Sequence, residues 1–198
     1  VIDMIEKVSA LHFDHHIGLF GDHEGKNNLL KIKEIKDLNI FQVAKFKKSS
    51  VDISQIKIDD VSLPLSNPLV SHNSDIRILW TGPDTWTFIS ENPLKEKITS
   101  SFNDIDFGIT DLSHSRAAIQ IQGDNAIDVL KKGSPVNFNE DQFSVNSSAN
   151  TTYNGINILI DFISLDPKTL NIYSLRSFGG SFYHSITDSA LEYGYEGI

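Results

Sequence analysis

The stretch DLSHSRAAIQIQGDNAIDVL, residues 111–130, decides the fold. Its middle part, AAIQIQ, alternates apolar and polar residues and predicts a half-buried β-strand. Asp124 follows the strand and is typical of a helix N-cap, and Ile127 and Leu130 give the expected helix an apolar side that ends at Gly133. A strand that leads directly into a short helix indicates a mixed α and β fold.

Turn residues on both sides of this stretch predict hairpins. Upstream, DIRILW and TWTFIS flank the turn TGPD at residues 81–84. Downstream, Asn154-Gly155 separates two strand-like runs in TTYNGINILIDFI, and DPKT at residues 166–169 returns the chain into LNIYSLRSF. Asn-Gly between β-rich runs is the strongest short-range hairpin signal. Because hairpins dominate the connections, we expect an α+β fold with mostly antiparallel sheets.

Helix starts are expected at three further places. Asn92-Pro93 pairs an N-cap residue with a proline at the first helical position, ahead of an apolar face. Ser181 is expected to cap the last helix. Ser50 is expected to cap a short helix over residues 52–60.

Composition limits the function classes. The 198 residues carry a formal net charge of -9 and no cysteine. An acidic chain is a poor match for nucleic acid or an anionic membrane, and the lack of cysteine excludes disulfides and thiolate catalysis. No charged-then-apolar leader opens the sequence, and no apolar run approaches the roughly 20 residues that span a bilayer. We therefore expect a soluble, cytoplasmic protein.

Two motifs contain residue types that catalysis or phosphate binding uses. Arg176 and the pair Gly179-Gly180 precede the last helix, but no Lys-Ser/Thr follows them, so a tight strand-to-helix turn is favoured over a phosphate site. DLSHSR contains the residue types of a hydrolase triad. On a strand, however, Ser113 and His114 point to opposite sides, and Asp111 is expected to cap the backbone instead.

A metal site is a further alternative. The segment LHFDHHIGLFGDHEG, residues 11–25, holds four of the seven histidines among acidic residues. Imidazole and carboxylate suit zinc, but the segment lacks HExxH spacing and its glycines favour a loop. A metal-dependent enzyme built on these histidines therefore stays an alternative.

Linked motifs in register resemble the gamma subunits of heterotetrameric sarcosine oxidases. They are SLPLSNPLV, ILWTGPDTWTFIS, DLSHSRAAIQIQGDNAIDVLKKGSPVNF and LRSFGGSFYHSITDSALEYG, in that order. The resemblance covers residues 37–198 of a single domain over 1–198, and residues 1–36 match poorly. FGITDLSHSRAAIQIQGDNAIDVL is also similar to the folate-dependent aminomethyltransferases, which implies a fold of two related halves. A weak internal similarity between RILWTGPDTWTFI and AAIQIQGDNAIDVL, aligned with Gly82 on Gly123, agrees with two related halves.

The resemblance implies a non-catalytic subunit without catalytic, cofactor or metal residues of its own. The complex is expected to demethylate sarcosine oxidatively to glycine, with hydrogen peroxide and 5,10-methylenetetrahydrofolate as further products. FAD, FMN, NAD, zinc and tetrahydrofolate are expected on other subunits, and the partners are the alpha, beta and delta chains. The alternative is a free-standing folate-binding aminomethyltransferase-like protein, which needs a carboxylate facing the pterin.

Aromatic residues and arginine dominate interface energetics. The tryptophans beside TGPD, the DLSHSR turn and the corner RSFGGSFYH supply such residues, with some of the corner expected to face a flavin-bearing subunit. The expected interface residues are Trp80, Trp86, His114, Arg116, Arg176, Phe178, Tyr183 and His184.

Overall fold

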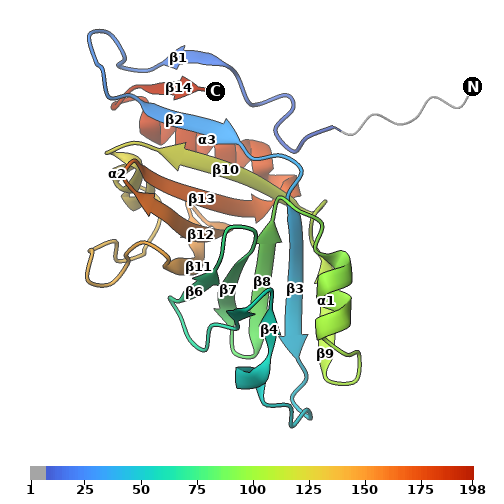
Figure 1. The fold of residues 1–198 in the computed structure, drawn as a ribbon. Helices are drawn as coiled ribbons and strands as arrows, with labels where there is room; N and C mark the ends of the chain where they lie inside the picture. Colours follow the sequence, from blue (N-terminus) through green and yellow to red (C-terminus); the bar gives the residue numbers. More distant parts are fainter. Residues whose placement is uncertain (1–7) are drawn as a thin grey trace, which may run out of the picture.

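The computed structural model describes residues 8–198, which form two large β-sheets, a two-stranded sheet and three α-helices (Figure 1). In spatial order, the seven-stranded sheet contains β1 (Gly18–Phe20), β14 (Tyr195–Gly197), β2 (Leu30–Glu34), β10 (Arg116–Gln122), β13 (Lys168–Leu175), β12 (Ile156–Leu165) and β11 (Ser148–Tyr153). Only the β14–β2 pair among these is parallel.

The second sheet is fully antiparallel. In spatial order it contains β6 (Val70–His72), β7 (Arg77–Gly82), β8 (Thr85–Ser90), β3 (Asn39–Lys45) and β9 (Phe107–Asp111). The short strands β4 (Lys57–Ile58) and β5 (Val61–Ser62) pair only with each other. The helices are α1 (Lys95–Ser101), α2 (Ala126–Lys131) and α3 (Gly179–Ala190), with 3-10 turns η1 (Ile53–Gln55) and η2 (Arg176–Phe178).

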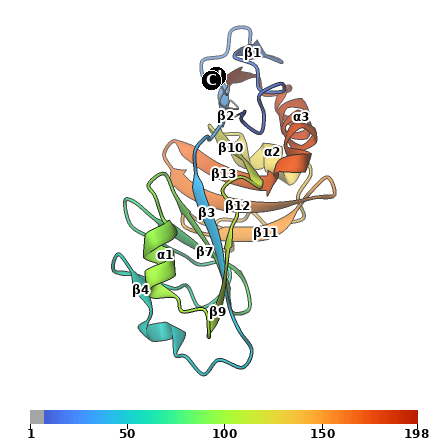
Figure 2. The same cartoon turned by 90° about the vertical axis from the view of Figure 1, so that its right-hand side faces the viewer.

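Three apolar cores hold these layers together. Strand alternation sends Ile119 and Ile121 of β10 toward α2 and α3, while Ala118 faces the other sheet. In β8, Trp86 and Phe88 pack in the core that α1 covers, and Ile89 faces the seven-stranded sheet. Figure 2 shows the resulting order, with helices outside and the two sheets meeting between them.

The α+β class with mostly antiparallel sheets is confirmed, and so are the expected hairpins. Trp80 and Trp86 are directly opposed in the β7–β8 hairpin. Asn154 and Gly155 connect β11 to β12 with φ of 46° and 82°, the left-handed conformation that an Asn-Gly turn requires. These turns were predictable because two residues determine each of them.

The expected helix starts were wrong in position. The helix after Asn92 begins at Lys95, and its N-cap is Leu94, which makes no side-chain cap bond. Asp124 does not cap α2, because Asn125 holds that position. Ser181 lies inside α3.

The short helix expected over residues 52–60 was also wrong. A single 3-10 turn and the short strand β4 form there, and the turn is capped by Asp52 rather than Ser50. Gly82 ends a strand and Gly123 follows one, as the internal similarity predicts, but the first leads into a hairpin and the second into a helix.

The N-terminal segment is part of the fold. Residues 1–7 lie outside the described part of the chain, but β2 is an inner strand between β14 and β10. Leu11, Leu30 and Ile32 are fully buried in the core under α3. The apolar core therefore begins well before residue 37, where the family-like region was expected to start.

Candidate subunit interface and inter-sheet cleft

Two of the eight expected interface residues are core residues. Trp86 is 1% exposed, and its Nε1 donates a hydrogen bond to the carbonyl oxygen of Pro64 at 2.8 Å. Tyr183 is 3% exposed and packs edge-on against the ring of His15. The expectation that they contact a partner is therefore corrected. Both lie on the inward face of their element, Trp86 with Phe88 and Tyr183 with Ile186.

The other six side chains reach the surface to different degrees. Trp80 is half-buried against the core that contains Trp86, and it lies apart from the rest. The remaining five lie around the place where β10 begins and β13 ends, a region we call the sheet-end surface: His114, Arg116, Arg176, Phe178 and His184. The structure thus brings together five of the eight residues.

Backbone pairing explains this gathering. Arg116 is the register partner of Leu175, and the amide of Arg176 donates to the carbonyl oxygen of Ser115 at 2.9 Å. His114, Arg116 and Arg176 line one cleft of about 290 Å³. The DLSHSR turn and the RSFGG corner, 60 residues apart in sequence, therefore form one surface.

The glycine corner is a tight packing turn. A Cβ on Gly179 would lie 3.0 Å from the Cβ of Ala117, and one on Gly180 would lie 2.7 Å from Oδ2 of Asp14. The Asp14 carboxylate also contacts Nε2 of His184, at 2.9 Å from its Oδ1. A carboxylate already occupies the space in front of the glycines, which argues against a phosphate there.

The DLSHSR segment is a turn and not the strand that we expected. Asp111 Oδ1 accepts from the amide of Ser113 at 2.9 Å and from its hydroxyl at 2.6 Å, and that hydroxyl holds the pKa of Asp111 below its usual range. Ser113 Oγ also accepts from the amide of Ile40 at 3.0 Å. His114 is exposed. The backbone-capping role of Asp111 is confirmed. The hydroxyl of Ser113 is already hydrogen-bonded to Asp111 and to the backbone of Ile40.

The N-terminal histidines show no metal geometry. Among residues 8–198, no group of three or more histidine, aspartate or glutamate side chains could hold a metal ion. Nε2 of His15 is buried without a hydrogen-bond partner in that part of the chain. Arg176 Nη2 donates to the carbonyl oxygen of Val8 at 2.6 Å, so Arg176, like His184, holds the N-terminal segment in place.

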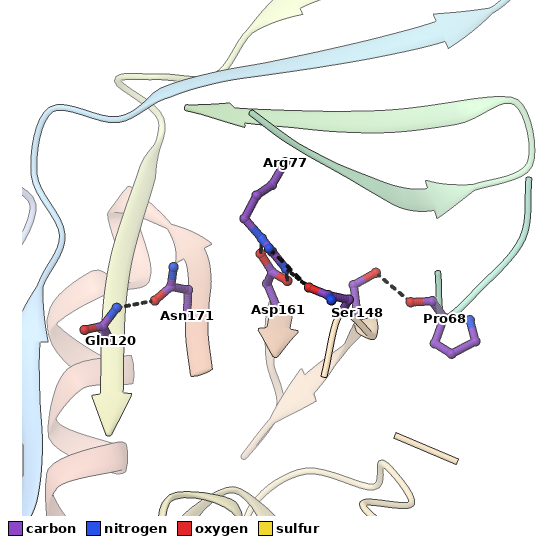
Figure 3. Close-up of polar contacts among 7 residues, drawn as sticks. Pro68, Arg77, Gln120, Ser148, Asp161 and Asn171 are labelled. Carbon is purple, nitrogen blue, oxygen red and sulfur yellow. Dashed lines mark hydrogen bonds and ion pairs between the residues drawn. The ribbon is translucent and has the colours of Figure 1, made fainter. Parts of the chain in front are cut away.

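A buried ion pair that sequence reasoning missed connects the two sheets (Figure 3). Arg77 of β7 donates from Nε to Oδ2 of Asp161 at 2.6 Å and from Nη2 to Oδ1 at 2.7 Å. Asp161 of β12 is fully buried, and Asn146 accepts further, longer bonds from Arg77. A signal was present, since Asp161 is the one charge in the apolar strand INILIDFISL. The pair is a direct contact between β7 of one sheet and β12 of the other.

A cleft of about 220 Å³ also lies between the sheets, and we call it the inter-sheet cleft. The five-stranded sheet contributes Gln42, Thr81 and Ile89, and the seven-stranded sheet contributes Arg116, Asn157 and Tyr173. Arg116 is half-buried, and desolvation lowers its pKa. The cleft therefore combines apolar walls, amides and hydroxyls with a guanidinium.

Burial of Tyr183 predicts a pH effect. Desolvation raises the pKa of Tyr183 to about 12, whereas an unfolded chain has a tyrosine pKa of about 10. The unfolded state then loses its proton first, so stability is complete below pH 10 and falls as pH rises toward 12. Through this residue the loss reaches about 3 kcal/mol.

We expect Tyr183→Phe to flatten this alkaline decline, as measured by urea unfolding at pH 8, 10 and 11. The decline will not vanish, because burial also raises the pKa of Tyr153 and Tyr195. An unchanged slope in the variant would contradict the assignment.

Chains of known structure share this fold. A chain of heterotetrameric sarcosine oxidase from Corynebacterium sp. U-96, solved in complex with pyrrole 2-carboxylate, superposes with a TM-score of 0.79. The match covers 94% of this chain and 96% of that one, at 21% identity. Aminomethyltransferase T of the glycine cleavage system from Bartonella henselae gives a TM-score of 0.59 at 11% identity, over 82% of this chain and 47% of that one. The chain is thus an α+β protein of the aminomethyltransferase-like fold.

The sequence comparison finds a relative among sarcosine oxidase subunits. The curated sarcosine oxidase subunit gamma of Corynebacterium sp. (strain U-96) is 30% identical over 89 residues, which span 44% of this chain and 43% of the relative. The chain matches less than half of that relative's length in sequence. No protein-family model matches the chain. The expected resemblance to a sarcosine oxidase gamma subunit is confirmed.

Proposed function

We propose that the chain is the gamma-type subunit of a heterotetrameric sarcosine oxidase. The observation that carries the proposal is the structural match to a chain of that complex, which covers nearly all of both chains. The sequence similarity to a gamma subunit agrees with it. Its role is to bind its partners through the sheet-end surface, with alpha, beta and delta chains as those partners.

We further propose that the other subunits carry out the reaction and hold the cofactors. The complex converts sarcosine to glycine, with hydrogen peroxide and 5,10-methylenetetrahydrofolate as further products. FAD, FMN, NAD, zinc and tetrahydrofolate belong to the other subunits, and the complex is cytoplasmic. Within residues 8–198, no helix is long and apolar enough to cross a membrane.

The inter-sheet cleft does not supply the groups that a free-standing folate-dependent transferase needs. Such an enzyme needs a carboxylate facing the pterin, and no aspartate or glutamate of residues 8–198 lines the inter-sheet cleft. Asp111, the acid inside the shared motif, is bonded to Ser113. At about 220 Å³ the cleft is also smaller than the roughly 300–1,000 Å³ of pockets for drug-sized ligands.

Co-expression tests the proposal. The tagged chain is co-expressed with its neighbouring genes, purified, and examined for stoichiometry, visible absorption and oxidation of sarcosine. A yellow complex of four different chains that oxidises sarcosine is the expected result. A colourless chain that binds tetrahydrofolate by itself would favour the transferase.

Phe178 offers the sharpest test of the sheet-end surface. It is 48% exposed and makes no side-chain hydrogen bond, whereas Arg176 and His184 also hold the N-terminal segment. We expect Phe178→Asp to reduce the co-purified partner chains about tenfold or more, as for an aromatic interface hot spot. The position is the N-cap of α3, where aspartate is favourable, so the stability of the chain should hold.

Phe46→Asp is the matched control. Phe46 is 44% exposed and follows β3 at the far end of the five-stranded sheet (Figure 1). Its substitution should leave the yield of the complex unchanged. Equal losses in the two variants would mean that the sheet-end surface is not the specific contact.

A further inference from the structure

We propose that the inter-sheet cleft binds a small organic carboxylate through the guanidinium of Arg116. Arg116 also belongs to the sheet-end surface, but the inter-sheet cleft lies on its other side, and its test uses the chain without partners, so the site does not depend on the proposed function. It rests on the charge, the hydrogen-bonding groups and the size of the cleft.

The charge of the cleft is unusual for this protein. The chain has a net charge of -9, yet Arg116 is the only charged residue of residues 8–198 that lines the inter-sheet cleft. A single positive group between low-dielectric walls focuses its field on the space in front of it. An anion is therefore the ligand that the cleft attracts.

Arg116 is available to such a ligand. It is half-buried, and it forms no ion pair with a carboxylate in the described part of the chain. In that part of the chain its guanidinium donates only long hydrogen bonds, from Nη1 to the carbonyl oxygen of Ser115 at 3.4 Å and to the Ser115 Oγ at 3.3 Å. A guanidinium has five donors, and removing it from water without an anionic partner is unfavourable. Arg77, by contrast, has its carboxylate.

The second cleft beside Arg116 is less suited to an anion. That cleft, of about 290 Å³, is also lined by Arg176, Lys36 and His114, but Glu34 and Asp37 lie there as well. Two carboxylates there offset part of the charge of Lys36, Arg116 and Arg176, whereas no carboxylate of residues 8–198 lines the inter-sheet cleft beside Arg116. The ligand carboxylate is therefore expected on the side of Arg116 that faces the inter-sheet cleft.

The other residues that line the cleft favour an organic acid over an inorganic anion. Ile89 and Ile158 offer apolar contact, while the amides of Gln42 and Asn157 offer donors and acceptors. Tyr173 lines the same cleft, and its buried hydroxyl has no hydrogen-bond partner within residues 8–198. The volume of about 220 Å³ suits a short carboxylic acid with one polar group. An inorganic oxyanion would leave the apolar walls unused.

Calorimetric titration of the full chain with N-acetylglycine tests the site. We expect saturable binding, and binding at least about tenfold weaker for the neutral analogue N-acetylglycinamide, because a hydrogen bond to a charged group is lost. Equal binding of the two compounds, or none of the acid, would overturn the proposal. This comparison uses the unmodified chain, so it does not depend on any variant folding.

Two arginine variants locate the site. Arg116→Gln should weaken N-acetylglycine binding at least about tenfold, whereas Arg176→Gln should leave it within about twofold, since Arg176 lies outside the cleft and exposed charges are screened. An equal loss in both would place the anion elsewhere and refute the assignment. Inorganic phosphate that competes at equal affinity would overturn the organic part of the proposal.

Discussion

Replacing Arg77 with methionine is expected to lower the free energy of unfolding by about 3–5 kcal/mol, because the substitution removes the partner of a fully buried carboxylate. Burial already raises the pKa of Asp161, and the bonds from Arg77 are what oppose that rise. Without them the variant must either hold an unpaired charge between the sheets or protonate Asp161. Urea or thermal unfolding at pH 7 measures the loss, with a melting temperature lower by about 10 °C.

Two controls separate burial from the loss of a charge. Lys97→Met breaks an exposed ion pair of the same length, 2.6 Å to Asp59, and should cost less than about 1 kcal/mol. Arg77→Met combined with Asp161→Leu removes both charges and should recover most of the stability, because an apolar pair of similar volume often replaces a buried ion pair well. If Arg77→Met costs no more than Lys97→Met, the ion pair does not hold the sheets together.

Local turn chemistry was readable in the sequence, but contacts between distant residues were not. Asn154-Gly155 forces a hairpin wherever it stands between two strands, so the prediction needed no tertiary information. Arg77 and Asp161 are 84 residues apart, and no local signal connects them. Helix starts failed for a related reason. Packing of Leu94 and Ile98 sets where α1 begins, and the capping preference of Asn92 is too weak to override it.

The expected interface residues show the same difference between local patterns and long-range contacts. Strand alternation places Trp86 on the face of Phe88, and the helical period places Tyr183 on the face of Ile186, so both burials could have been predicted. Arg116 and Arg176 were identified as surface residues, but their shared cleft depends on the pairing of β10 with β13. That pairing is a long-range contact. Composition indicated an interface, and only the sheet register locates it.

The N-terminal segment provides the second large effect. Leu11 is fully buried, its amide donates to Oε1 of Glu34 at 3.0 Å, and its side chain packs where Gly179 begins α3. We expect Leu11→Ala to lower the free energy of unfolding by about 2–5 kcal/mol, from lost burial and the cavity left behind. Unfolding in urea measures this change.

Leu19→Ala is the control within the same segment. Leu19 is 53% exposed on the edge strand β1, so its truncation should change stability by no more than about 0.5 kcal/mol. A small effect in both variants would make the segment an appendage that the core does not need. A large effect at Leu11 alone would show that β2 and the chain leading into it belong to the folding unit, because a buried contact next to Gly179 holds both the segment and the sheet-end surface in place.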